Sequence, residues 1–158
     1  MREIPLTHGK TAIVDDVDFE RLGIHHWSCC KAGYAMRGFR DNGKMVYLKM
    51  HHAVIGKPPP GYVVDHINGN RLDNRRGNLR FVTFQQNSFN TRKHQVENVT
   101  SRFKGVSYMR DKHKWRSRIM IGGREKHIGL YGTEEEAALA YNEAAKSYFG
   151  EYAKLNEI

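Results

Sequence analysis

Several features that are common in folded proteins are scarce in this chain of 158 residues, and each scarcity excludes a class of protein. Its two cysteines, Cys29 and Cys30, are neighbours, so a disulfide between them would be strained, and no Cys-x-x-Cys zinc pair exists. No apolar run approaches the roughly 18 residues of a membrane-spanning helix. Residues 1–5 lack the apolar core of a signal peptide. We therefore expect a cytoplasmic protein with reduced thiols and no membrane partner.

Acidic residues are scarce in the middle of the chain. The formal net charge is +9, and residues 71–118 hold thirteen Lys or Arg against three Asp or Glu. The rest of the chain is close to neutral, so the middle segment is expected to bind a polyanion, of which nucleic acid is the commonest. The alternative is a solvated basic face without a ligand. Aromatic and Asn residues between the basic ones disfavour that alternative.

Turn signals and short apolar runs predict a first folded unit over residues 1–92. Its expected strands are 11–14, 33–37, 45–48, 62–64 and 79–82, and a short helix is expected at 51–55. A further helix should begin at Thr83, because Gln86 stands three residues later as a capping-box partner. The local order from residue 62 onward is strand, polar loop, strand and helix.

A linker over residues 93–100 and a second unit over 101–158 are expected to follow. Strands are predicted at 102–109, 115–121 and 126–131, with a helix from Thr133 to Gly150. In the middle strand Trp115, Ser117, Ile119 and Ile121 alternate with Arg116, Arg118 and Met120. The helix carries a stripe formed by Ala137, Tyr141, Ala144, Ala145 and Tyr148. We expect a sheet that packs on one helix and leaves its cationic face free.

The stretch of residues 65–87 combines an Asp-His pair with many Asn and Arg residues. Asn68-Gly69 by itself would indicate only a hairpin turn. A calcium loop of the EF-hand type is excluded, because Ile67 occupies a position that needs an oxygen ligand. The loop therefore calls for another chemical interpretation.

The residue types in this stretch fit the chemistry of phosphodiester hydrolysis. Asp65 and Asn87 offer one carboxylate and one amide oxygen, a sufficient protein share for Mg²⁺, which keeps several waters. His66 has an unperturbed pKa of about 6.5 and is suited to taking a proton from water. Neighbours on a regular strand point to opposite sides, so we expect a bend or a bulge at Asp65 and His66.

The spacing of these residues resembles the HNH endonuclease family, in the Asn-ending ββα-metal form of phage and intron-encoded nucleases. The resemblance spans most of residues 1–92 and implies that Asp65 and Asn87 bind the metal and His66 is the general base. Asn78 matches the central Asn and would brace the loop that orients His66. Other similar segments are Met50-His51-His52, where His52 replaces a more usual Arg, Asp65-His66-Ile67-Asn68-Gly69-Asn70 and Asn78-Leu79-Arg80.

The second unit resembles the DNA-binding domain of plant ethylene-response factors, which places a three-stranded sheet in the major groove. The similar segments are Arg102-Phe103-Lys104-Gly105-Val106, Lys114-Trp115, Ile128-Gly129, the alanine-rich stretch 137–145 and Ala153-Lys154-Leu155-Asn156. Departures are Ser107, Met109, Met120 and Glu125 in place of Arg, His127 in place of Trp, and Arg118 in place of an acidic residue. Binding through the sheet is implied, whereas the plant recognition sequence is not.

We thus predict an α+β protein that is a metal-dependent, homing-type endonuclease acting on double-stranded DNA. The expected cofactor is one divalent ion, Mg²⁺ first and Mn²⁺ as the alternative. The expected state is monomer or weak homodimer, in a bacterial cytoplasm if the chain is phage-encoded. The alternative is a DNA-binding regulator with an inert nuclease fold; an RNA-directed role is disfavoured because no aromatic platform for single strands stands out. Predicted DNA contacts are Arg75, Arg76, Arg80, Arg92, Lys93, Lys104, Arg116 and Arg118.

Overall fold

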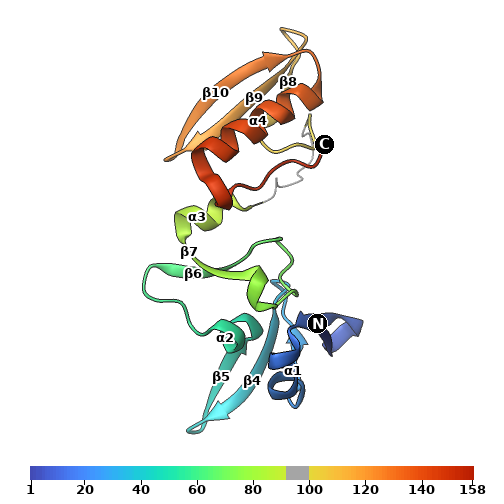
Figure 1. Cartoon of the computed structure of the whole chain (residues 1–158), viewed down its shortest axis with the longest axis vertical. Helices are drawn as coiled ribbons and strands as arrows, with labels where there is room; N and C mark the ends of the chain where they lie inside the picture. The colour runs from blue at the N-terminus through green and yellow to red at the C-terminus, as the bar shows by residue number, and fades with distance from the viewer. Residues whose placement is uncertain (92–99) are drawn as a thin grey trace. The chain divides into compact units, whose positions relative to one another are not determined.

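The structure is a computed structural model that describes residues 1–91 and 100–158. The chain divides into two compact units, Met1–Asn87 and Ser88–Ile158, each of which combines strands and helices (Figure 1). The predicted α+β class is confirmed. No helix in the described ranges is long and apolar enough to cross a membrane.

The first unit consists of short elements that form small antiparallel sheets, ordered β1-β2, β3-β4-β5 and β6-β7. The predicted strands, the helix at 51–55 and the capping box of Thr83 with Gln86 are all present. The elements are β1 (Arg2–Pro5), η1 (Thr7–Gly9), β2 (Thr11–Val14), α1 (Asp16–Gly23), β3 (Ser28–Cys29), β4 (Ala35–Asp41), β5 (Lys44–Lys49), α2 (Met50–Ile55), β6 (Tyr62–His66), η2 (Arg76–Asn78), β7 (Leu79–Thr83) and α3 (Phe84–Phe89).

The core of this unit joins segments that are distant in the sequence. Its buried side chains come from β1, β2, α1, β4, α2 and β7, and they include Ile4, Val14, Leu22, Met50 and Leu79. Helix α1 was not predicted, because only Asp18 and Leu22 of its eight residues are buried and so few positions give no clear helical period.

The loop between β6 and β7 is anchored to β2. Ile13 N donates to Leu72 O at 2.8 Å, and Asn74 N donates to Ile13 O at 2.7 Å. These two bonds add a parallel bridge between Ile13 and Asp73 to the edge of β2. The loop therefore has a fixed backbone although it is rich in turn residues.

The second unit is the predicted three-stranded antiparallel sheet packed on one helix (Figure 1). Its elements are β8 (Val106–Met109), β9 (Lys114–Ile121), β10 (Arg124–Tyr131), α4 (Glu134–Phe149) and η3 (Gly150–Tyr152), with strand order β10-β9-β8. On β9, Ser117 and Ile119 are buried, whereas Met120 is exposed, as the alternation predicts. Thr133 and Glu136 form the capping box that starts α4.

One position of the predicted helical stripe is wrong. Tyr148 is exposed, and the buried aromatic residue of the last turn is Phe149, whose ring stacks on Phe89 with centroids 4.0 Å apart. The stacking partner lies sixty residues earlier in the chain. The helical period alone could not choose between the two neighbouring aromatic residues.

Replacing Gly105 by alanine is expected to destabilise the second unit by about 3 kcal/mol or more. Gly105 has φ +76°, and a Cβ there would lie 2.1 Å from the Tyr141 ring and 2.5 Å from Arg118 O. Urea unfolding followed by circular dichroism measures the loss. Gly122→Ala is the matched control, since φ is +56° there but nothing lies within 4 Å. Equal losses in the two variants would show that backbone strain, and not the contact with Tyr141, is responsible.

Candidate functional site

Asp65 and His66 are the last two residues of β6, and both are buried. The register with β7 runs without a shift, pairing Asp65 with Arg80 and His66 with Leu79, so the pairing contains no bulge. The chain turns directly after the strand, where Gly69 N donates to His66 O at 2.8 Å. The bulge that the sequence suggested at Asp65 and His66 is thus absent from this pairing, and the chain turns only after His66.

Asn78 ties the two ends of the loop together. Its Oδ1 accepts from Asn68 N at 3.0 Å, and its Nδ2 donates to Asp73 O at 2.8 Å. Its backbone oxygen also accepts from Ile67 N at 2.9 Å. These contacts hold the residues that directly follow His66, which is the geometry that a bracing role requires.

Asn74 is a site residue that the sequence analysis missed. Its Oδ1 lies 3.4 Å from His66 Nε2, and the side chain is almost completely buried. Its Nδ2 donates to Leu72 O at 3.1 Å, which leaves Oδ1 as the acceptor that faces the imidazole. Because an amide oxygen only accepts, this contact favours the tautomer with the proton on Nε2 and the lone pair on Nδ1. No local signal in the sequence marks this contact, which depends on the anchoring of the loop to β2.

Burial lowers the pKa of His66 below its ordinary value, and the positive charge of Arg71 acts in the same direction. The hydrogen bond with Asn74 and the carboxylates of Asp65 and Asp73 oppose this shift. Because the lowering is the larger effect, the imidazole is neutral near neutral pH and able to accept a proton.

Two further aromatic rings pack against His66. His51, on α2, lies with its ring centroid 5.3 Å from that of His66, and Tyr34 lies 5.9 Å from His66. Burial lowers the pKa of His51 to about 3, so this imidazole stays neutral. Among the residues that the structure describes, its Nδ1 has no hydrogen-bond partner. His51 thus contributes a neutral ring to the packing around His66.

The two predicted metal ligands lie on the first strand and on the helix of the ββα unit, Asp65 on β6 and Asn87 on α3. The carboxylate of Asp65 accepts from Arg80 Nη2 at 2.9 Å and from Nε at 3.0 Å. Asn87 is half-buried on α3, the helix that follows the strand paired with β6. Within residues 1–91 and 100–158, no three His, Cys, Asp or Glu side chains gather as a metal-binding group. A metal at this place would depend on these two oxygen donors and on water.

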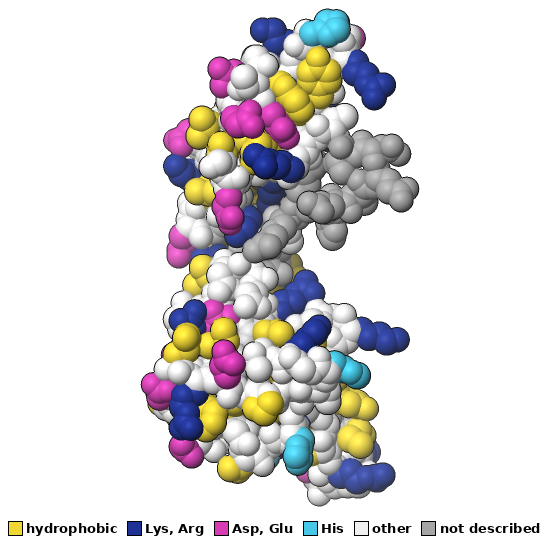
Figure 2. All heavy atoms as spheres, turned by 90° about the vertical axis from the view of Figure 1, so that its right-hand side faces the viewer, with side chains coloured by type: hydrophobic (Ala, Val, Ile, Leu, Met, Phe, Trp, Pro, Cys, Tyr) yellow, Lys and Arg dark blue, Asp and Glu magenta, His cyan; other side chains and the backbone are white. Residues whose placement is uncertain are grey.

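Three of the predicted arginines of the first unit are held in ion pairs. The pairs are Arg75 with Asp73 at 2.7 Å, Arg76 with Asp18 at 2.8 Å and Arg80 with Asp65 at 2.9 Å. The predicted contacts Arg92 and Lys93 lie outside the described residues. On the face shown in Figure 2, the described Lys and Arg side chains are scattered among acidic and uncharged ones.

Two of the predicted contacts in the second unit lie on the free sheet face, and the third does not. Arg116 and Arg118 are on β9 and share one carboxylate, that of Glu125 on β10. Lys104 precedes β8, and its ammonium donates to Phe89 O at 2.8 Å and Thr91 O at 2.7 Å. Burial lowers the pKa of Lys104 to about 8. The sheet face thus presents an Arg-Glu-Arg group, while Lys104 holds backbone carbonyls.

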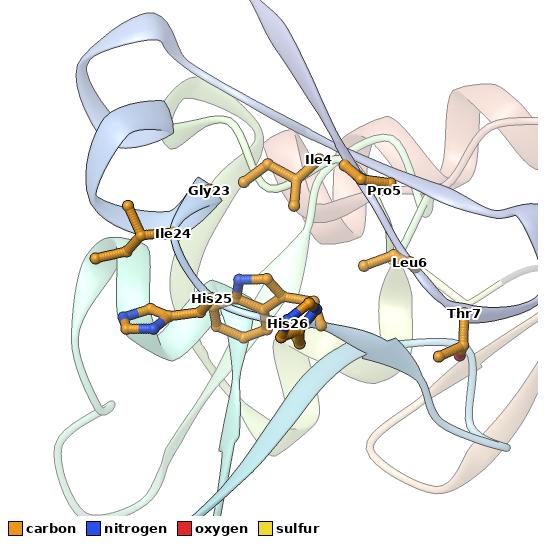
Figure 3. A pocket seen from close by; sticks show the side chains of 9 residues that line it. Ile4, Pro5, Leu6, Thr7, Gly23, Ile24, His25 and His26 are labelled. Carbon is orange, nitrogen blue, oxygen red and sulfur yellow. The ribbon is translucent and has the colours of Figure 1, made fainter.

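A hollow in the first unit lies apart from these residues. It has a volume of about 400 Å³ and is lined by β1 and by the segment after α1 (Figure 3). Its lining includes Ile4, Leu6, Ile24, His25 and Trp27, and most of its exposed lining is apolar. None of the predicted site residues contributes to it.

Comparison with known proteins identifies the first unit. The model of the family described as HNH endonuclease matches residues 49–89, which include α2, β6, β7 and α3. A protein of Acanthamoeba polyphaga mimivirus named uncharacterized HNH endonuclease L560 is 36% identical over 152 residues, covering 95% of this chain and 76% of that protein. The chain belongs to the HNH endonuclease family. This HNH endonuclease is also similar to Protein 3.8 of Escherichia phage T7, at 28% identity over 69% of this chain and 88% of that protein.

The second unit of this HNH endonuclease is similar to a different family. The AP2 domain model matches residues 101–151. The AP2-like ethylene-responsive transcription factor At1g16060 of Arabidopsis thaliana is 38% identical over 58 residues, covering 35% of this chain and 17% of that protein. The chain thus combines an HNH endonuclease domain with an AP2-like DNA-binding domain, which implies DNA as the partner.

Proposed function

We propose that this HNH endonuclease hydrolyses phosphodiester bonds in double-stranded DNA with the help of one divalent metal ion, and that its AP2-like domain selects the target. The observation that carries the proposal is the position of His66, which is buried at the end of β6 with its Nε2 3.4 Å from Asn74 Oδ1. Asn74 orients the ring, burial keeps it neutral, and the imidazole takes a proton from the attacking water.

The donor set at Asp65 and Asn87 fits Mg²⁺, with Mn²⁺ as the alternative. HNH nucleases generally use a divalent metal ion, and Mg²⁺ binds through few protein oxygens because it retains water. Arg80 holds the buried carboxylate of Asp65 in place through an ion pair of 2.9 Å. When bound, the ion would offset the charge that develops on the phosphate and on the leaving oxygen. His66 moves the proton, and Asn78 keeps the loop that follows His66 in place.

Targeting by the second unit is supported by its free sheet face. Arg116 and Arg118 lie on that face, and Glu125 holds both guanidinium groups in a defined position. A guanidinium held in this way is suited to the bidentate contact with guanine that reads a base in the major groove. A cleavage site that contacts mainly one phosphate supplies little sequence information, so selection must come from another surface.

Cleavage of a genomic DNA library, followed by sequencing of the ends, tests both parts of the proposal. With Mg²⁺ the full chain is expected to produce ends at recurring sequences, and with a chelator none. The double variant Arg116→Ala, Arg118→Ala should still cut, with ends scattered over many sequences. Lys146→Ala is the matched control, since it removes a paired cation from α4 and not from the sheet face. DNA binding without any metal-dependent ends would favour the regulator with an inert nuclease fold.

A further inference from the structure

Two basic residues near His66 differ from the arginines of the ion pairs. Lys49 ends β5, and Arg71 lies in the loop between β6 and β7. Within the described residues neither has an acidic partner at ion-pair distance, whereas Arg75, Arg76 and Arg80 each have one. The positive charge of Lys49 and Arg71 is therefore available to an anion.

Both cations converge on the same aromatic ring. Lys49 Nζ lies 4.6 Å and the Arg71 guanidinium carbon 4.8 Å from the centroid of Tyr34. Arg71 Nη1 also donates to Ala32 O at 2.6 Å, which fixes the guanidinium beside the ring. The tyrosine face attracts each cation. It therefore holds together two charges that would otherwise repel each other.

The Tyr34 ring, which carries these cations, also packs against His66 and His51. The centroid of Tyr34 is 5.9 Å from that of His66 and 5.2 Å from that of His51. No described carboxylate neutralises the charges of Lys49 and Arg71, and both lie near the proposed general base. Together they form a site for an anion next to His66.

We infer that Lys49 and Arg71, held on Tyr34, bind the DNA phosphate at the bond that His66 helps to hydrolyse. The inference rests on the proposed nuclease function and adds to it the residues that hold the substrate phosphate. Because a phosphate contact carries no base information, the pair positions DNA and does not select its sequence. Three segments contribute to it: the residues before β4, the end of β5 and the loop after β6.

The test compares Lys49→Gln and Arg71→Gln with the matched control Arg2→Gln in the full chain. Arg2 also lies over an aromatic ring, 3.5 Å from the Phe19 centroid, but is paired with Glu20 at 3.0 Å. Binding to a duplex of arbitrary sequence is measured in chelator over a range of salt. Removal of one phosphate contact should reduce the slope of log affinity against log salt by about 0.9. The control should keep the wild-type slope.

Single-turnover cleavage at saturating protein supplies the second readout. Lys49→Gln and Arg71→Gln are expected to slow cleavage on the order of 10²-fold, because each removes charge that stabilises the transition state. Tyr34→Leu, which removes the aromatic ring that holds both cations, should show both defects. If Tyr34→Leu does not fold, the two Gln variants of these cations still decide the question.

Unchanged slopes and rates within threefold of wild type in both Gln variants would overturn the inference. A reduced slope with an unchanged rate would also overturn it, since the contact would then lie away from the reacting phosphate. If the wild-type protein shows no metal-dependent cleavage but the two variants still have shallower slopes, the proposed nuclease function fails while the phosphate contact stands.

Discussion

Replacing His66 by alanine is expected to slow DNA cleavage on the order of 10²–10⁴-fold, the usual cost of losing a general base. The side chain is buried and neutral, so its removal takes away a proton acceptor and almost no phosphate attraction. DNA affinity should therefore stay close to that of the wild type. The loss should appear in the rate at saturating protein and not in the concentration dependence.

Single-turnover cleavage and binding in chelator separate these two quantities. His26→Ala is the matched control, because His26 is an exposed histidine of the same unit at the hollow away from the site. Circular dichroism of both variants checks that the fold is retained. A His66→Ala protein that cuts within threefold of the wild-type rate would remove His66 from the mechanism.

Replacing Asp65 or Asn87 by alanine is expected to raise the Mg²⁺ concentration for half-maximal cleavage at least about 10-fold. Each side chain offers one oxygen donor, and within the described residues no cluster of His, Cys, Asp or Glu offers a substitute. Titration of the cleavage rate with Mg²⁺ and with Mn²⁺ measures the midpoint. An unchanged midpoint in both variants would move the metal elsewhere, for example to the surroundings of His51.

The two substitutions differ in their effect on stability. Asp65 is paired with Arg80, whose side chain is only 15% exposed, so Asp65→Ala removes the carboxylate that faces a poorly solvated cation. Asp65→Asn keeps the side-chain size and one acceptor oxygen for Arg80, but it removes the negative charge and replaces the second oxygen by an NH₂ group. It therefore tests metal binding with less disturbance of Arg80. Asp41→Ala, at an exposed position at the end of β4, is the control.

Much of the second unit could be predicted from local sequence. The alternation of Ser117 and Ile119 with Arg116 and Arg118 assigned the two faces of β9, because side chains of a strand alternate strictly. Thr133 and Glu136 marked the start of α4, since a capping box involves only neighbouring residues. What the alternation could not predict is the carboxylate of Glu125 between the two arginines, because that contact depends on the register of β10.

In the first unit the order β6, loop, β7 and α3 could be predicted without the structure. The chemistry of the residue types singled out Asp65, His66 and Asn87, and the resemblance to the HNH endonuclease family added Asn78. Local signals suffice there, since turn residues, alternation and a capping box each act within a few positions.

The side chains that meet around His66 could be found only in the folded protein. Asn74 reaches His66 because β2 anchors its loop, and Tyr34, Lys49 and Arg71 come together from three separate segments. The same packing placed Arg76 on Asp18 of α1, fifty-eight residues earlier in the chain. Such contacts depend on the packing of distant segments, and the local pattern of a sequence does not reveal that packing.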